Sequence, residues 1–177
     1  MENISTCPLC GSGDVLQMFD MPDYSENTTE KPFSLSQCKC CTLIFLSKRP
    51  FERDAYNYYP DSYQPFVGNY RPLVKKYIEI RTKREIALFH SYARIINNVL
   101  DIGCASGEYL ANLKKYGNYS KCVGLEIDAV AAESGRKRFG LHIIQGTLES
   151  ASFPDESFDL ITMNHVIEHV YSPRDTV

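Results

Sequence analysis

Apolar runs alternate with glycine turns and amphipathic segments over the second half of the chain. The predicted strands cover residues 99–102, 122–127, 141–144 and 158–163. The predicted helices cover residues 108–116 and 129–139, where apolar positions recur at helical spacing. Strands and helices in this order predict a parallel sheet flanked by helices, with ligands at the carboxyl ends of the strands. We therefore expect an α/β fold with a Rossmann-like, doubly wound parallel sheet.

The segment from residue 71 to 96 also has helical periodicity. Its apolar positions, from Leu73 to Ile96, recur at spacings of three and four, which predicts one amphipathic helix or two. Lysine and arginine outnumber glutamate on the other face. This charge pattern indicates a solvated helix face, with a binding surface as the alternative.

The first 66 residues differ in composition from the rest. They hold five of the seven cysteines and six of the nine prolines, with short β-like runs at 14–19 and 43–46. A tyrosine-rich stretch that includes Tyr63 is interrupted by Pro60 and Pro65, so it cannot be one regular helix, and we interpret it as a linker or lid. We predict a small module with its linker at residues 1–66 and the α/β domain at 67–177.

Charge and hydropathy narrow the classes of partner. The net charge of −3 gives no general attraction to phosphate backbones, so nucleic acid is not favoured as the main partner. No apolar run is long enough for a membrane span, and the N-terminus lacks the pattern of a signal peptide. We expect a cytoplasmic protein with reduced cysteines, which are then metal ligands or core residues rather than disulfides. The sequence predicts no oligomeric state.

A glycine turn follows the first predicted strand of the α/β part. In VLDIGCASGEYL the strand ends at Asp101, and Gly103 and Gly107 precede a helix. Glu126 ends the next strand, 19 residues after Gly107, where a carboxylate can accept hydrogen bonds from ribose hydroxyls. A dinucleotide site usually reads G-x-G-x-x-G, whereas the spacing here is G-x-x-x-G and an acid precedes it. Asp101 would repel a pyrophosphate but suits the ammonium and sulfonium of S-adenosylmethionine.

Residues 98–170 resemble the class I S-adenosylmethionine-dependent methyltransferase superfamily. The first motif of that family, which wraps the methionine part of the cofactor, falls on Asp101, Gly103, Cys104 and Gly107. Its ribose-binding acid falls on Glu126. The resemblance implies a methyltransferase that binds S-adenosylmethionine, and Cys104 is expected to be a small residue at the turn rather than a nucleophile.

The same resemblance extends beyond Glu126. Ile127 falls on the apolar residue that packs against adenine, and Thr147 and Leu148 on the segment that borders the ring. Asn164 and His165 fall near the methionine and the transferable methyl group. The family's sheet has seven strands, so this chain would hold the first four, with the C-terminal strands missing. We therefore expect a fragment of a longer protein, with a degenerate half-domain as the alternative.

Two C-x-x-C pairs lie in the N-terminal module. Cys7 and Cys10 form the first pair and Cys38 and Cys41 the second, with 27 residues between the pairs. Two such pairs can close a tetrahedral, structural zinc site, as in a zinc ribbon, and such a metal helps a small module to fold. Cys40 is an alternative to Cys41, which we prefer because it completes the usual C-x-x-C turn.

The module also resembles the N-terminal zinc-binding domain carried by a subset of these methyltransferases, which includes sugar C-methyltransferases. The shared features are CPLCGS, the second C-x-x-C pair, an apolar strand and the tyrosine-bearing stretch. This resemblance implies a small-molecule acceptor, such as a nucleotide sugar or another polar metabolite.

The string His165-x-x-Glu168-His169 allows three interpretations. His165 can act as a general base on the acceptor, since a neutral imidazole accepts a proton near pH 7. The three side chains can instead hold a divalent metal, as a similar cluster does in some RNA 2′-O-methyltransferases. They can also simply line the cofactor pocket or satisfy local hydrogen bonds.

Two main functions from different classes remain open at this point, and a dinucleotide-dependent oxidoreductase is a distant third. The first is methyl transfer from S-adenosylmethionine to a small molecule. The alternative is a non-catalytic zinc-ribbon protein whose α/β part contacts protein or RNA. Cofactor binding separates the two, because both predict zinc.

Overall fold

A computed structural model describes residues 1–24, 28–59, 68, 70–93 and 95–176. The chain divides into two compact units, one made of Met1–Asp61 with Glu168–Val177 and the other of Ser62–Ile167. The segment from Glu168 onward thus belongs to the first unit. The predicted domain division after residue 66 stays a prediction.

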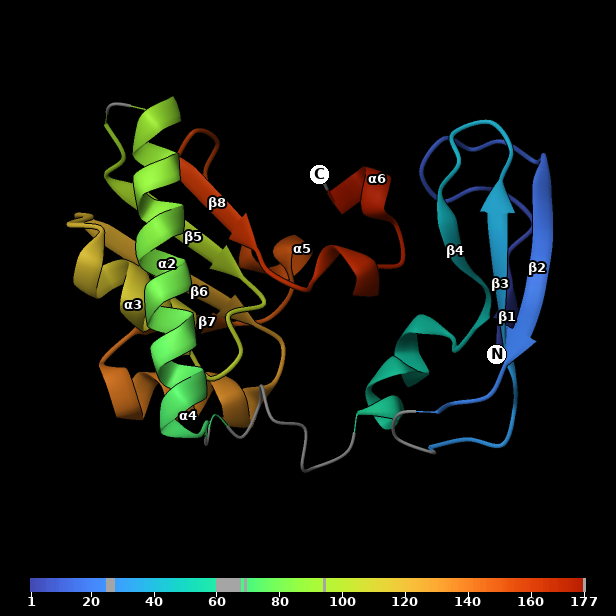
Figure 1. Cartoon of the computed structure of the whole chain (residues 1–177), viewed down its shortest axis with the longest axis horizontal. Coiled ribbons are helices and arrows are strands. Elements are labelled where there is room, and N and C mark those ends of the chain that lie inside the picture. The colour runs from blue at the N-terminus through green and yellow to red at the C-terminus, as the bar shows by residue number, and fades with distance from the viewer. Residues whose placement is uncertain (25–27, 60–67, 69, 94, 177) are drawn as a thin grey trace. The chain divides into compact units, whose positions relative to one another are not determined.

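The first unit is built on an antiparallel sheet of four strands (Figure 1). Its spatial order is β1-β4-β3-β2. The strands are β1 (Glu2–Asn3), β2 (Val15–Met21), β3 (Phe33–Cys38) and β4 (Ile44–Arg49). A 3-10 helix, η1 (Glu52–Tyr58), follows β4, and the short helix α6 (Pro173–Thr176) also belongs to this unit.

The sheet of the first unit has little apolar core. Along β3 the residues facing the interior are Ser34, Ser36 and Cys38, and the Ser36 hydroxyl bonds to that of Ser47 at 2.6 Å. Cys7 and Cys38 are the only buried apolar side chains among the described residues 1–59. Hydrophobic burial therefore contributes little to the stability of this unit, and another interaction must supply free energy of folding.

The C-terminal segment is attached to the first unit through Arg49. The Arg49 guanidinium lies 4.1 Å from the centre of the Tyr171 ring and donates a hydrogen bond to the Tyr171 carbonyl. The Tyr171 hydroxyl in turn donates to the carbonyl of Pro50 at 2.9 Å. These contacts join residues far apart in the sequence within one unit.

The second unit contains a parallel sheet with the spatial order β7-β6-β5-β8 (Figure 1). The strands are β5 (Asn98–Ile102), β6 (Lys121–Glu126), β7 (His142–Gln145) and β8 (Leu160–Met163). The helices are α2 (Pro72–Tyr92), α3 (Glu108–Tyr116), α4 (Ala129–Phe139) and α5 (Leu148–Ala151). The 3-10 turn η2 (Ile167–His169) follows β8.

Local signals in the sequence explain where the helices of the second unit begin and end. Gly107 precedes α3 with a left-handed backbone, φ 81°. The side chain of Asp128 caps α4 by accepting from the Ala131 N–H at 2.7 Å, and Gly140 ends it with φ 60°. Leu110 and Leu113 of α3 are fully buried in the core. The C-terminal ends of β5 and β6 are thereby held in a packed scaffold.

The structure confirms the predicted α/β fold with four parallel strands and the N-terminal module. Within the segment 71–96 the structure has one helix, α2, which ends at Tyr92. The strand β3 was not expected from the sequence. Tyr63 and Pro65 of the tyrosine-rich stretch lie outside the described residues. Among the described residues, no helix combines the length and the apolar character that a membrane crossing requires.

Candidate functional site

The glycine loop lies at the carboxyl end of β5 and is tied to β6. The backbone N–H groups of Gly103 and Cys104 both donate to the carbonyl of Leu125, at 2.8 and 3.1 Å. Gly103 has φ 65°, and a Cβ added there would lie 2.3 Å from a methyl group of Val166. A left-handed backbone and close packing both favour glycine at this position. The loop is thus fixed at the edge of the sheet where ligands of such folds bind.

Asp101 is buried at the end of β5. Its Oδ1 accepts a hydrogen bond from the Thr162 hydroxyl of the adjacent strand at 2.7 Å. Burial raises the pKa of Asp101 to about 7, the hydrogen bond from Thr162 opposes this rise, and the charges of Glu126 and Glu85 add to it. The carboxyl group therefore lies among other acidic groups, where a cationic ligand would stabilise its charged form.

Glu126 lies at the end of β6, and its carboxylate reaches the glycine loop. Oε2 accepts from the Ala105 N–H at 2.7 Å, and Oε1 accepts from the Asp128 N–H at 2.9 Å. Burial raises the pKa of Glu126, and these backbone hydrogen bonds oppose the rise. Each carboxylate oxygen has a further acceptor position, so the group can still accept from a ligand hydroxyl.

The residues predicted for the adenine side lie after β6 and β7. The Ile127 side chain is 62% exposed, which is unusual for isoleucine directly after a buried strand. Thr147 caps α5 in a capping box with Ser150. Leu148, the first residue of α5, packs against the second core cluster of the sheet. An exposed apolar residue beside the Glu126 carboxylate suits a ligand with a planar apolar ring.

Asn164 and His165 follow the end of β8. Oδ1 of Asn164 accepts from Nη2 of Arg81 at 2.5 Å, and Nε of Arg81 donates to Glu85 at 2.7 Å. His165 has a left-handed backbone, φ 55°, which is uncommon outside glycine and clusters at functional sites. Because η2 is a three-residue 3-10 turn that begins after His165, the string H-x-x-E-H does not lie on one α-helical face.

Cys104 is a buried residue of the glycine loop. A Cβ on Gly124 of β6 would lie 2.5 Å from its sulfur, so the thiol fills space that glycine leaves. Burial, and then the charge of Asp101, raise the pKa of the Cys104 thiol above its usual range. A thiol in this environment is protonated and a weak nucleophile.

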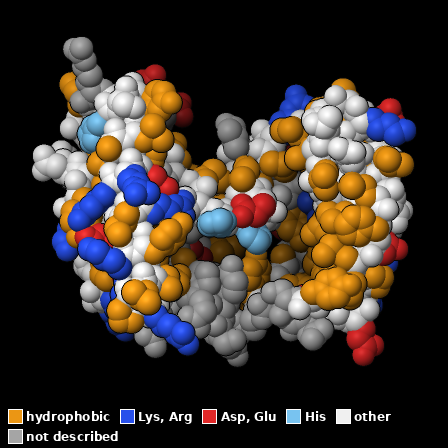
Figure 2. Space-filling view, in the orientation of Figure 1, with side chains coloured by type: hydrophobic (Ala, Val, Ile, Leu, Met, Phe, Trp, Pro, Cys, Tyr) orange, Lys and Arg blue, Asp and Glu red, His pale blue; other side chains and the backbone are white. Residues whose placement is uncertain are grey.

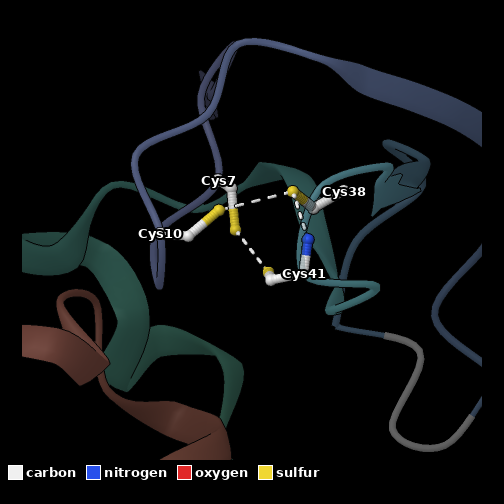
Figure 3. Close-up of side chains that lie close together, drawn as sticks. All are labelled: Cys7, Cys10, Cys38 and Cys41. Atoms are coloured by element: carbon white, nitrogen blue, oxygen red, sulfur yellow. Dashed lines mark hydrogen bonds between the residues drawn. The ribbon is translucent and has the colours of Figure 1, made fainter.

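The side chains of the two C-x-x-C pairs lie close together (Figure 3). The sulfur atoms of Cys7, Cys10, Cys38 and Cys41 all lie within 4.8 Å of one another. The Cys7–Cys41 and Cys10–Cys38 pairs are each 3.5 Å apart. A zinc ion with Zn–S bonds of about 2.3 Å holds tetrahedral sulfurs about 3.8 Å apart, so these distances fit zinc. Cys40 is exposed and is not part of the cluster.

The turns that present the two cysteine pairs have the same geometry. The N–H of Gly11 donates to the Cys7 carbonyl, and the N–H of Thr42 donates to the Cys38 carbonyl, both at 2.9 Å. Gly11 and Thr42 also share a left-handed backbone, with φ 75° and 64°. A hydrogen bond from the Cys41 N–H is the largest of the causes that lower the pKa of Cys38 to about 7. This donor favours the thiolate, which is the form that binds metals.

The structure also shows residues near the site that the sequence reasoning missed. Thr162 contacts Asp101, Asp128 contacts Glu126, and Arg81 contacts Asn164. Asp128 had a readable signal, because it precedes an alanine-rich helical segment as an N-cap residue. The contact between Arg81 and Asn164 had none, since the two residues are 83 positions apart.

The predicted cofactor residues on β5 and β6 lie at the carboxyl ends of adjacent strands. Asp101 and Glu126 act on one another electrostatically, since the charge of Glu126 raises the pKa of Asp101. The surroundings combine buried acids, a tight glycine loop and the exposed Ile127. Acids for an ammonium and a ribose beside an apolar surface for a base fit the chemistry of S-adenosylmethionine.

Comparisons with known proteins find related sequences for the second half of the chain. The model of the methyltransferase domain family matches residues 100–177. Ribosomal RNA small subunit methyltransferase C of Actinobacillus pleuropneumoniae serotype 5b (strain L20) is 34% identical over 86 residues, which are 47% of this chain and 26% of that protein. The uncharacterized methyltransferase YcgJ of Bacillus subtilis (strain 168) is 32% identical over 90 residues, which are 48% of this chain and 35% of that protein.

A solved structure shares the fold. The plantazolicin methyltransferase BpumL, in complex with a pentazolic desmethylPZN analog and SAH, superposes with a TM-score of 0.51 at 15% identity. This likeness covers 68% of this chain and 48% of that chain. The chain thus spans well under two thirds of each of these proteins. The sequence of residues 100–177 is thus similar to methyltransferase domains, and the parallel sheet with its glycine loop agrees with that similarity.

Proposed function

We propose that the protein transfers a methyl group from S-adenosylmethionine to a small-molecule acceptor. The observation that supports this most strongly is the pair of buried carboxyl groups, Asp101 and Glu126, at the ends of adjacent parallel strands beside a tight glycine loop. The match of the methyltransferase domain model to residues 100–177 supports the same reaction.

Each end of the cofactor has a proposed set of residues. Asp101 accepts from the ammonium, and Glu126 accepts from the ribose hydroxyls with the acceptor positions that its backbone partners leave open. Ile127, Thr147 and Leu148 border the adenine. Gly103, Cys104 and Gly107 shape the loop around the methionine part, and Asn164 lies at the methionine end. These assignments rest on the placement of the residues and on the family resemblance.

The cofactor supplies an electrophilic methyl group on a sulfonium. The acceptor nucleophile attacks the methyl carbon as the carbon–sulfur bond breaks, and the sulfur keeps the electron pair as a neutral thioether. The protein contributes mainly by holding the two reactants in line. His165, with its left-handed backbone at the end of β8, is the proposed base that takes the proton of the acceptor.

The pairing of charged side chains on α2 supports a small-molecule acceptor rather than a nucleic acid. Lysine and arginine side chains gather over α2 (Figure 2), but several of them are paired with glutamates of the same helix. Lys76 and Lys83 both contact Glu79, and Arg81 contacts Glu85. Paired charges of this kind suit a solvated helix face. The resemblance of the N-terminal module to that of sugar C-methyltransferases favours a nucleotide sugar or another polar metabolite as the acceptor.

We propose that zinc binds the four cysteines of the first unit and has a structural role. All four ligands come from the protein, which leaves no open position for a substrate. The small apolar core among the described residues of this unit supports the same role, because metal binding then supplies free energy of folding.

Calorimetric titration with S-adenosylhomocysteine tests the cofactor assignment. We expect the wild-type protein to bind and Glu126→Ala to lose most of the affinity. Glu126→Gln keeps the side-chain shape if Glu126→Ala fails to fold, and Glu133→Gln, at an exposed residue of α4, is the control that retains affinity. Equal heats for wild type and both Glu126 variants, or none for any, would contradict the proposal. Binding of NAD in place of S-adenosylhomocysteine would instead indicate an oxidoreductase.

A further inference from the structure

The chain passes from the second unit to the first shortly after the candidate site. The second unit ends at Ile167, and the segment from Glu168 onward belongs to the first unit. Asn164 and His165 lie only a few positions before this junction. Their placement therefore depends on how the chain is held on each side of it.

On the side of the second unit, Val166 holds the chain. Its side chain packs against the core cluster that contains Leu100 and Val123. It also meets the glycine loop, since a Cβ on Gly103 would lie 2.3 Å from one of its methyl groups. The residue that directly follows His165 is thus fixed against the candidate cofactor site.

On the side of the first unit, two separate contacts hold the chain. A hydrogen bond of 3.0 Å joins the Tyr59 hydroxyl to Nδ1 of His169. Two positions further on, the Arg49 guanidinium lies 4.1 Å from the centre of the Tyr171 ring and donates to the Tyr171 carbonyl. The Tyr171 hydroxyl donates to the carbonyl of Pro50. We call the contacts between Arg49 and Tyr171 the Arg49–Tyr171 anchor.

Little chain separates the points that are held in the two units. His169 follows Val166 by three positions, which span at most about 10 Å of extended chain. A change at the Arg49–Tyr171 anchor therefore reaches the loop after β8 with little slack.

Arg49 is itself held by the sheet of the first unit. Its Nε donates to the Glu2 carboxylate at 2.8 Å, and the two residues are partners in the register of β1 and β4. The Arg49 side chain is only 18% exposed, and salt screens such a pair less than one on the open surface. The guanidinium thus has a fixed position from which it holds Tyr171.

The hairpin that ends at Arg49 also carries the second cysteine pair. The strand β3 ends at Cys38, and β4 begins at Ile44, shortly after Cys41. The Cys38 N–H donates to the carbonyl of Leu43 at 2.9 Å, which closes the turn between them. A metal at the four sulfurs would therefore order the hairpin whose last residue is Arg49.

We propose that Arg49 and Tyr171 are positioning residues that connect the zinc-binding unit to Asn164 and His165, so that zinc at the four cysteines tightens cofactor binding. This inference rests on the proposed function. The anchor acts by limiting the movement of the loop after β8, and the coupling is reciprocal, so the cofactor would also tighten zinc binding.

Hydrogen exchange followed by mass spectrometry tests the anchor itself. In Tyr171→Leu we expect the backbone amides of residues 164–171 to exchange about tenfold or more faster than in the wild type, while those of β5 and β6 keep their rates. This variant leaves the ion pair between Arg49 and Glu2 in place, so the first unit should keep its zinc. Tyr171→Phe loses only the hydroxyl and should have intermediate rates.

Calorimetric titration with S-adenosylhomocysteine tests the coupling. Removal of zinc with EDTA should weaken binding to the wild type about fivefold or more, as is typical of coupled sites. In Tyr171→Leu the binding should already be weaker by a similar factor, and removal of zinc should change it little. Arg53→Gln changes an exposed arginine of η1 and should behave like the wild type.

The possible outcomes separate this inference from the proposed function. Unchanged exchange rates in Tyr171→Leu would overturn the inference and leave the proposed function in place. So would a loss of affinity on removal of zinc that is absent from the wild type or equal in wild type and Tyr171→Leu. Failure of the wild type to bind S-adenosylhomocysteine would contradict the proposed function, and the exchange rates of residues 164–171 with and without zinc would then decide on the anchor.

Discussion

The hydroxyl of Thr162 donates a hydrogen bond to the carboxyl group of Asp101 across two parallel strands, at 2.7 Å. Both side chains are buried, and the two residues are direct partners in the register of β5 and β8. The acid that is proposed to bind the cofactor ammonium is thus oriented from the neighbouring strand. This relationship makes Thr162 a supporting residue of the site and leads to the first prediction.

Thr162→Val should destabilise the protein by about 2 kcal/mol at pH 8, because it removes a buried hydrogen bond to a charged group. At pH 5.5 Asp101 is protonated and the loss should be smaller, about 1 kcal/mol. Urea unfolding at the two pH values measures the difference. Ser91→Ala, which removes an exposed hydroxyl of α2, is the control. An equal loss at both pH values would show that Thr162 does not act on the charge of Asp101.

The raised pKa of Asp101 predicts a pH dependence of stability. Burial raises this pKa to about 7 in the folded protein, against about 3.9 in an unfolded chain. The folded state therefore binds the proton more tightly, so the stability contributed by Asp101 is complete below about pH 4 and is lost as the pH rises to about 7.

The Asp101→Asn variant has no titratable carboxyl group at this position. A comparison with it therefore isolates the contribution of Asp101 to the pH dependence of stability. The free energy of unfolding of the wild type, relative to that of Asp101→Asn, should fall by about 1.4 kcal/mol per pH unit between about pH 5 and 7 and then level off. Chemical denaturation at four pH values from 5 to 8 measures this. Parallel curves for the two proteins would mean that Asp101 keeps an ordinary pKa in the fold.

Gly103→Ala should destabilise the second unit by about 2 kcal/mol or more, because the new methyl group meets Val166 on a left-handed backbone. Gly140→Ala is the matched control. Gly140 is also left-handed, with φ 60°, but has open space around it, so we expect a cost of about 1 kcal/mol. Thermal unfolding measures both. Adding Val166→Ala to Gly103→Ala should recover part of the lost free energy of unfolding, because it removes the methyl group that the new side chain meets. If the effects of the two substitutions on the free energy of unfolding simply add, the proposed contact between residues 103 and 166 is wrong.

The order of strands and helices in the second unit could be predicted from the sequence, because each strand contains an apolar run and three of the four, β5, β6 and β7, end at or next to a glycine or an acid. The helix α4 is an example, since its predicted bounds, 129–139, agree with the structure. The strand β3 could not be predicted. Its alternation places Ser34 and Ser36 inward, the reverse of the polarity by which half-buried strands are found.

Some residues of the candidate site could likewise be predicted from the sequence, and others could not. Asp101, Gly107 and Glu126 lie where their positions at strand ends and turns predicted. Arg81 could not be found from the sequence, because on α2 it has the spacing of an ordinary ion pair with Glu85. Its contact with Asn164 depends on how α2 packs in the second unit, where it lies against α3, and such packing leaves no local pattern in the sequence.

Cys38→Ser should abolish zinc binding and unfold the first unit. This unit has little apolar core, so its folding depends on the metal held by the four sulfurs. Elemental analysis should find one zinc ion per chain in the wild type and in Cys40→Ser, whose thiol is exposed and outside the cluster. Limited proteolysis of residues 1–59 reports the unfolding. Full zinc content in Cys38→Ser, or its loss in Cys40→Ser, would show that the ligand set is wrong.

A crystal structure of the protein with bound S-adenosylhomocysteine tests the central claim most directly. We predict that the ribose hydroxyls lie within hydrogen-bond distance of the Glu126 carboxylate and that the amino-acid end lies between Asp101 and Asn164. Adenine should lie against Ile127 and Leu148. A ligand bound away from the carboxyl ends of β5 and β6, or a ribose without contact to Glu126, would contradict the account.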